Sequence, residues 1–161
     1  MPSVWVVNAS PLIFLGRLGR FDLLPALAEE VLVPEPVLTE VRVRDSPEAL
    51  QAQLENLERV RFEPEYPVSP DILAWDLGTG ESQVITIALR NKGAVAVLDD
   101  LQARRCAYSM GLRVMGTLGV LLRAKRAGFI LAARPLMIEL VDSGMYLDPD
   151  LMAQALAEVG E

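Results

Sequence analysis

Residues 4–13, VWVVNASPLI, give the clearest indication of the fold. Val4 to Val7 form a short uninterrupted apolar run, which is typical of a strand buried on both faces of a parallel sheet. Small polar residues follow at once, and Ser10 is suited to cap a helix that has Pro11 at its first position. The pattern predicts a strand, a tight turn and a helix, with Asn8 at the carboxyl end of the strand.

The same alternation of strand and helix continues along the chain. Further strands are predicted at 30–33, 59–62, 94–98 and 112–115. Helices are predicted at 21–28, from 34 past 41, from 45 to about 57, near 72, at 82–90, from 101 to about 110, at 116–128, and twice more after Pro135 and Asp148. The segment 63–70, with its three prolines, is the best candidate for an exposed linker. Strand and helix alternation predicts an α/β fold with a parallel sheet covered by helices on both faces.

The composition excludes several classes of chemistry. The 161 residues include no histidine, so catalytic triads, histidine zinc sites and imidazole bases are ruled out. Cys106 has no partner for an internal disulfide, and we interpret it as a small core residue. The net charge of -7 argues against binding nucleic acid by phosphate neutralisation alone. It is compatible with a nucleic-acid enzyme that takes its positive charge from bound metal ions.

Length and hydropathy predict one domain in the cytoplasm. The chain is of single-domain size, and we expect residues 1–161 to form one domain with about 131–161 as a C-terminal helical extension. It begins without a signal-peptide pattern and has no apolar run long enough to span a membrane. We therefore expect a cytoplasmic protein.

Polar side chains gather where the predicted parallel strands end. Asn8 follows the first strand, and Asp99 and Asp100 follow a later one. Sites in open parallel sheets form at this edge. Glu81 lies in the first turn of its predicted helix, and Glu40 lies among apolar neighbours on another.

Each of these residues also has a purely structural interpretation. Glu81 favours the positive end of a helix dipole, Glu40 can extend to water, and Asn8 can bond the turn backbone. One aspartate of the pair 99–100 can cap a helix, but a helix needs only one cap. Several acids facing one opening repel each other unless a cation neutralises them. Mg²⁺ or Mn²⁺ is the natural choice for oxygen ligands.

Four stretches, taken in order, resemble the PIN-domain superfamily of metal-dependent nucleases. They are VVNASPLIFLGRLGRFDLL, VLVPEPVLTEV, GTGESQVITIAL and VLDDLQARRCAYSMGLRVMGTLGVLLRAKRAG. The resemblance is to a little-characterised prokaryotic branch with an Asn-x-Ser-Pro-Leu-Ile start. It spans roughly residues 4 to 130, and the C-terminal helices fit it more loosely.

The resemblance implies a three-layer α/β/α fold whose acidic pocket holds Mg²⁺ or Mn²⁺ and cleaves RNA. The implied catalytic residues are Glu40, Glu81 and Asp100, and the implied metal ligands are Asn8, Glu40, Glu81, Asp99 and Asp100. The choice between Asp99 and Asp100 as the main ligand stays open. Ser10 matches a small hydroxyl residue that positions a water or ligand. Arg104, Arg105, Arg123 and Arg126 are candidate RNA contacts, with solvated helix positions as the alternative.

Asn8 departs from the superfamily, which has aspartate at this position. Its amide offers a neutral carbonyl oxygen, so the site loses one negative charge and should hold a divalent cation less tightly. Three hypotheses follow. The first is a ribonuclease, in one form the toxin of a toxin-antitoxin pair whose antitoxin brings a basic or helical segment to the pocket. The second is a catalytically weakened module that binds RNA or a partner protein.

The third hypothesis is a receiver domain, which also has a parallel sheet and an acidic pocket. It is weakened because such a domain needs an acid pair after the first strand and a lysine after a late strand, and this chain has neither. The PIN resemblance also makes a homodimer a candidate oligomer, and it implies no membrane partner.

Overall fold

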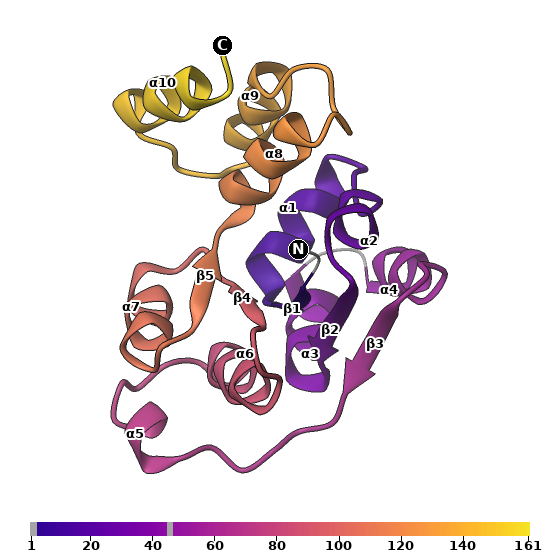
Figure 1. Cartoon of the computed structure of the whole chain (residues 1–161). Coiled ribbons are helices and arrows are strands. Elements are labelled where there is room, and N and C mark those ends of the chain that lie inside the picture. The colour runs from indigo at the N-terminus through magenta and orange to yellow at the C-terminus, as the bar shows by residue number, and fades with distance from the viewer. Residues whose placement is uncertain (1–2, 45–46) are drawn as a thin grey trace.

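The computed structural model describes residues 3–44 and 47–161, and its centre is a five-stranded sheet (Figure 1). The strands are β1 Val4–Val7, β2 Glu30–Pro34, β3 Val60–Glu63, β4 Val95–Val97 and β5 Arg113–Met115. All neighbouring strands pair in parallel; Trp5, for example, lies between Val31 and Val95. The predicted α/β class with a central parallel sheet is confirmed.

β1 occupies the middle of the sheet, whose order is β3-β2-β1-β4-β5. The chain first builds outward from β1 to β2 and β3, then crosses back to β4 and β5 on the other side. The carboxyl ends of β1 and β4 therefore border the point where the strand order reverses, the usual place for a site in such sheets. Receiver domains have the flavodoxin-like order 2-1-3-4-5, so the receiver hypothesis is wrong.

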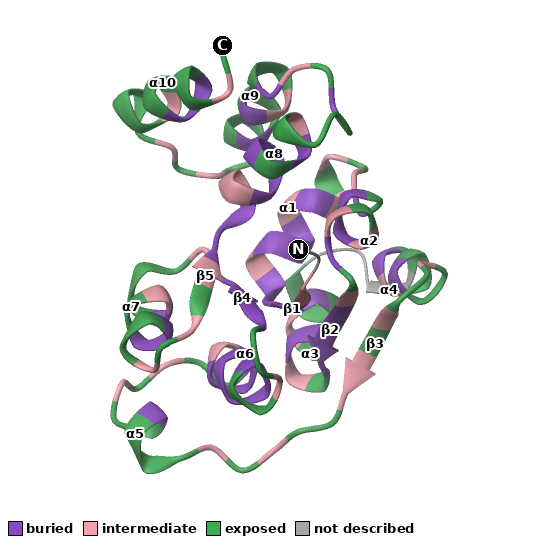
Figure 2. Cartoon of the chain, viewed as in Figure 1, coloured by how far each residue is buried: buried purple, intermediate pink, exposed green. Residues whose placement is uncertain are grey.

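Helices flank this sheet. They are α1 Ala9–Arg17, α2 Leu23–Leu27, α3 Glu35–Arg44, α4 Pro47–Glu55, α5 Pro70–Leu73, α6 Thr79–Arg90, α7 Leu101–Ser109, α8 Thr117–Arg126, α9 Arg134–Asp142 and α10 Pro149–Glu158. α6 packs across β1, β2 and β4, and its predicted apolar stripe of Val84, Ile85 and Ala88 is buried there. Figure 2 shows the buried residues concentrated in the central strands β2, β1 and β4 and on the inward faces of the helices.

The first helix differs from its prediction. α1 begins at Ala9 and its N-cap residue is Asn8, so the prediction of Ser10 as the cap was wrong. The amide of Leu12 donates to the carbonyl of Asn8, so Ser10 already lies inside the first turn of the helix. The predicted helix at 21–28 is the shorter α2. The two residues expected to start the fourth helix, Asp45 and Ser46, lie outside the described residues.

The predicted linker is tied to the sheet-covering helix α6. Residues 64–69 have no regular secondary structure, as expected, but the buried side chain of Gln83 binds both backbone groups of Tyr66. Its Oε1 accepts from the Tyr66 amide at 3.0 Å, and its Nε2 donates to the Tyr66 carbonyl at 2.7 Å. Arg90 also stacks on the Tyr66 ring, with its guanidinium carbon 4.0 Å from the ring centre. The segment is therefore an anchored crossover.

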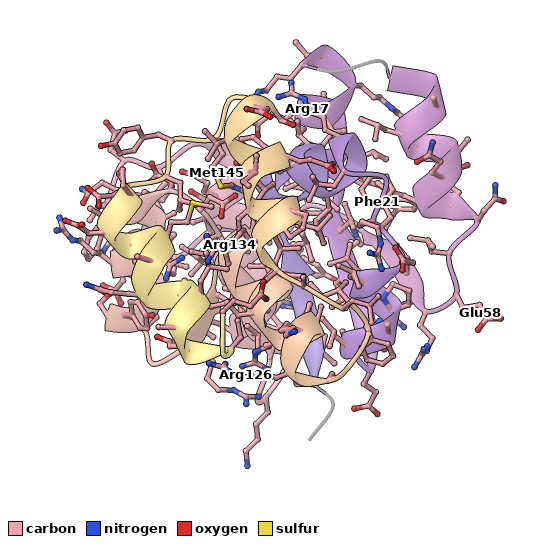
Figure 3. The ribbon with its side chains drawn as sticks, turned by 90° about the horizontal axis from the view of Figure 1, so that it is seen from above. Arg17, Phe21, Glu58, Arg126, Arg134 and Met145 are labelled. Carbon is pink, nitrogen blue, oxygen red and sulfur yellow. The ribbon has the colours of Figure 1, made fainter. Side chains whose placement is uncertain are left out.

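The C-terminal helices complete the core. Met137 and Leu140 of α9 and Leu156 of α10 are buried in it, together with the predicted core residue Cys106. Arg17 of α1 donates from Nη1 to the carbonyl oxygen of Ser143 at 2.7 Å. Figure 3 shows Arg17 beside the end of α9. This hydrogen bond thus joins the end of α1 to the end of α9.

Among residues 3–44 and 47–161, no helix has both the length and the apolar character needed to cross a membrane.

Candidate functional site

A pocket of about 400 Å³ lies where β1 and β4 end. Its lining consists of Asn8, Ser10, Phe14, Glu40, Arg44, Glu81, Asp99, Asp100, Gly144, Met145 and Tyr146. The six residues predicted as ligands, catalytic groups or accessory group all lie in this lining. They come from four separate parts of the chain, which the switch in strand order brings to one edge of the sheet. We call this cavity the acidic pocket.

Asn8 forms the floor of the acidic pocket. Its backbone amide donates to the carbonyl of Val97 at 3.1 Å and so extends the pairing of β1 with β4. Its side chain is buried, at 5% exposure, and its Oδ1 has no hydrogen-bond partner. A buried polar atom without a partner costs about 1–3 kcal/mol. This oxygen is therefore available to a ligand that enters the pocket.

Gly80 makes room for two of the oxygens. A Cβ atom at this position would lie 3.0 Å from Glu40 Oε2 and 3.4 Å from Asn8 Oδ1. Both oxygens therefore face the same small space beside α6. Sequence reasoning did not single out Gly80, although its place directly before Glu81 at a helix start was visible. Only the packing of α3 against α6 shows why a side chain is excluded there.

Glu81 is the acid of the pocket whose pKa its surroundings raise. Burial raises the pKa of its carboxyl above the ordinary value, and the negative charges of Asp100 and Glu40 raise it further. A backbone hydrogen bond from Gly78 acts in the opposite direction. The pocket therefore gathers more negative charge than its own groups neutralise, which favours a cation.

Asp99 is held by hydrogen bonds from two neighbouring elements. Its Oδ1 accepts from the Thr117 amide at 2.7 Å, and its Oδ2 accepts from the Thr117 hydroxyl at 2.7 Å and the Ser10 hydroxyl at 3.1 Å. It thus connects the end of β4 to the first turns of α8 and α1. Ser10 has this role in place of the predicted helix cap.

Asp100 has the single capping role that sequence analysis allowed for one of the pair. Its Oδ2 accepts from the Ala103 amide at 3.0 Å at the start of α7. Its side chain is exposed at the pocket rim. Both aspartates therefore line the pocket, but both oxygens of Asp99 accept hydrogen bonds from α8 or α1, whereas Asp100 accepts through Oδ2 within its own helix.

The basic residue at the pocket is Arg44, which sequence reasoning missed. Its Nη1 lies 3.4 Å from Glu40 Oε1, one helical turn away on α3. The i, i+4 spacing of an arginine and a glutamate was the available signal. The arginines that were predicted to contact RNA lie elsewhere: Arg105 and Arg123 are exposed outside the lining, and Arg126 pairs with Glu158 of α10.

Arg104 also lies outside the acidic pocket but next to it. Its Nη1 donates to the carbonyl of Leu98 at 3.4 Å, and it lines a second cavity with Asp99. Figure 3 shows Arg126 at the end of α10 that is far from Met145, consistent with its place outside the pocket.

The oxygen atoms that line the pocket are of the chemical type that binds divalent cations. Asn8 Oδ1 is buried and unpartnered, Glu40 Oε2 faces the same space, and Glu81 is desolvated beside two other acids. Hard oxygen donors of this type suit Mg²⁺ or Mn²⁺. In the part of the chain that the structure describes, no three acidic or cysteine side chains converge tightly enough to enclose an ion by themselves. An ion in this pocket would need at least one further oxygen, and Asn8 Oδ1 is the buried lining oxygen that has no partner.

Comparison with known proteins supports the fold and its family. A family model described as PIN domain matches residues 4–161 and so includes the C-terminal helices. No curated protein matches the chain. The crystal structure of PAE2754 from Pyrobaculum aerophilum is similar, with a TM-score of 0.51 and 17% identity over 76% of this chain and 97% of that one. At this identity the likeness concerns the fold alone.

Proposed function

The chain belongs to the PIN-domain family, and on that premise we propose that it is a ribonuclease dependent on Mg²⁺ or Mn²⁺. The family indicates a nuclease-type fold. The observation that carries the proposal is the acidic pocket itself, in which the unpartnered Asn8 Oδ1 lies among Glu40, Glu81 and Asp100. The chain has no histidine, so acid-base chemistry falls to carboxylates or lysines, and the pocket lining contains carboxylates but no lysine.

The proposed roles follow from the contacts of each residue. Asn8, Glu40, Glu81 and Asp100 would hold the cation. A bound Mg²⁺ or Mn²⁺ supplies positive charge to the phosphate and lowers the pKa of a water molecule. One of the three carboxylates orients the attacking water. Asp99, whose oxygens already accept three hydrogen bonds, lies beside these ligands and keeps the ends of β4 and α8 in place.

Isosteric variants test this assignment. Glu81→Gln and Asp100→Asn should each reduce Mn²⁺-stimulated cleavage of single-stranded RNA by about a hundredfold or more, because each removes a charged ligand without changing side-chain volume. Glu58→Gln is the matched control. Glu58 is exposed and lies far from Met145 in Figure 3, so this variant should cleave as the unmodified protein does. Full cleavage by both pocket variants would remove these residues from the mechanism.

A second candidate function is binding of RNA or a partner protein without catalysis. It is favoured by the neutral Asn8 and by the ion pair between Glu40 and Arg44, which together reduce the charge available to a cation. Calorimetry separates the two candidates. If no divalent ion binds at millimolar concentration while RNA still binds, the binding function replaces the ribonuclease.

The proposal extends to a protein partner. The carboxylates of the acidic pocket suit a basic segment, as an antitoxin would provide to a toxin. Co-expression with the product of a neighbouring short reading frame tests this extension: a partner should co-purify and inhibit cleavage. Sedimentation of the protein alone tests the expected homodimer.

A further inference from the structure

Tyr146 lies between the acidic pocket and a second cavity. It belongs to the connection between α9 and α10, and its side chain is 87% exposed. It lines the acidic pocket and also a groove of about 550 Å³. Asp99 and Met145 are shared by both cavities in the same way. The two cavities therefore adjoin each other at Tyr146.

The backbone around Tyr146 is held on both sides. Before it, the Met145 amide donates to the Leu140 carbonyl at 3.0 Å, and Gly144 has a φ of +106°, a conformation that favours glycine. After it, the Asp148 side chain caps α10 by accepting from the Asp150 amide at 2.8 Å. The ring is thus presented to solvent from a fixed segment.

The groove beyond Tyr146 is mostly apolar. Its walls come from β5, α7, α8 and α10, and include Val114, Leu118, Leu122 and Leu151. Arg104 is the basic residue in its lining, among the described residues. Such walls suit the flat face of a nucleobase better than they suit a phosphate.

Electrostatics leaves little affinity for RNA from phosphate contacts. The chain has a net charge of -7, and Arg44 at the acidic pocket is already paired with Glu40. Stacking of a base on an aromatic ring is independent of net charge and is the usual way in which unpaired RNA bases are held. An exposed tyrosine next to the acidic pocket provides this contact.

We propose that Tyr146 stacks on a base of single-stranded RNA next to the phosphate in the acidic pocket, with the neighbouring nucleotide in the apolar groove. The inference rests on the proposed ribonuclease function, which supplies the phosphate position. It makes Tyr146 a determinant of RNA affinity. Because the ring is exposed, removing it should leave the fold intact.

Binding measurements test this inference separately from cleavage. A fluorescently labelled, mixed-sequence oligoribonucleotide is titrated with the protein in Ca²⁺, and the same RNA is then cleaved in Mn²⁺. Tyr146→Ala should weaken binding about tenfold and raise KM with little change in kcat. Tyr146→Phe should retain binding, since it keeps the ring. Tyr108→Ala is the matched control, because Tyr108 is also exposed but lies on α7 outside both cavities.

An oligomer of abasic ribose phosphates separates stacking from other effects. Tyr146→Ala and the unmodified protein should bind it equally. Equal affinity of Tyr146→Ala and unmodified protein for the base-containing RNA overturns the inference, as does an absence of RNA binding. If binding depends on Tyr146 but no RNA is cleaved in Mn²⁺, the stacking role stands and the ribonuclease proposal fails.

Discussion

At the scale of single residues, Asn8 is the position on which the metal proposal depends most. It is buried at the end of the central strand, and its Oδ1 has no partner within the protein. A turn residue would direct this oxygen to nearby backbone amides. Instead it faces the space that Gly80 leaves open beside Glu40. The position of Asn8 is therefore suited to a metal ligand, but its side chain is uncharged.

Restoring a carboxylate at this position should strengthen the site. We predict that Asn8→Asp tightens Mn²⁺ binding roughly tenfold, because ligand charge is a main determinant of divalent-cation affinity. Isothermal calorimetry measures the effect. Added Mn²⁺ should also raise the Tm of this variant more than that of the unmodified protein, because the ion neutralises the buried charge that the variant adds.

Asn56→Asp is the matched control for this variant. It adds the same charge at an exposed position before β3, at the opposite edge of the sheet. Its affinity for Mn²⁺ should be unchanged. Equal or weaker Mn²⁺ binding by Asn8→Asp would make Asn8 a turn residue outside the ligand set.

At the scale of elements, the acidic pocket depends on a clamp between β4 and α8. Thr117 is fully buried, and its backbone amide and its hydroxyl both donate hydrogen bonds to the Asp99 carboxylate. Gly116 allows this approach, since a Cβ there would lie 2.9 Å from Asp99 Oδ1 and 2.6 Å from Arg104 Nη1. The clamp explains why two adjacent aspartates follow β4: each is bonded to a different helix.

Removing the hydroxyl from the clamp should destabilise the fold. We predict that Thr117→Val lowers the free energy of unfolding by about 1.5–3 kcal/mol, the range for a hydrogen bond to a charged acceptor. Urea unfolding measures it. Thr39→Val, at an exposed position whose hydroxyl bonds only its own helix, should change stability by less than about 0.5 kcal/mol. An equal effect of both variants would mean that the clamp contributes nothing.

At the scale of the whole molecule, Glu161 joins the C-terminal helices to each other. Its carboxylate accepts from the amides of Ala133 at 2.6 Å and Arg134 at 3.2 Å, and lies 3.9 Å from Lys125 Nζ of α8. These contacts, with the Ala133 amide first, hold the pKa of Glu161 below its ordinary value. Stabilisation of this kind is present above the unfolded-state pKa and is lost as the pH falls through the folded-state pKa.

This linkage predicts a pH-dependent effect of Glu161→Gln. At neutral pH the variant should melt at a lower temperature than the unmodified protein. The difference should shrink as the pH falls below the ordinary glutamate pKa and vanish once Glu161 is protonated in the folded state. Thermal unfolding at a series of pH values measures it, with Glu58→Gln as the control. A Tm difference that is constant across the acidic range would exclude the linkage.

Much of this fold was predictable from local pattern. Short apolar runs followed by polar turns mark β1 and β4 well, because a strand buried on both faces must be apolar throughout. The start of α1 was misplaced because Asn8 and Ser10 are both good cap residues. The choice between them depends on the hydrogen bond from the Ser10 hydroxyl to Asp99, which lies 89 positions away in the sequence.

The candidate site shows the same division. Parallel strands deliver their carboxyl ends to one edge, which predicted that Asn8, Asp99 and Asp100 would meet; Glu40 and Glu81, which lie on helices, joined the predicted set through the family resemblance. Three features were not predicted: the different hydrogen bonds of Asp99 and Asp100, the ion pair of Arg44 with Glu40, and the presence of Tyr146 in the pocket lining. Each depends on side-chain directions or on a connection whose position relative to the sheet has no local signal.

Local sequence pattern is enough to predict the succession of strands and helices, the parallel sheet, and the polar residues Asn8, Asp99 and Asp100 at its carboxyl edge. These features follow from apolar periodicity and from residues that end strands, which act over a few positions. The tertiary structure adds the hydrogen bonds that occupy Asp99, the space that Gly80 leaves between α3 and α6, and the place of Tyr146 at the pocket. Those features arise from contacts between distant segments, and packing is what selects them.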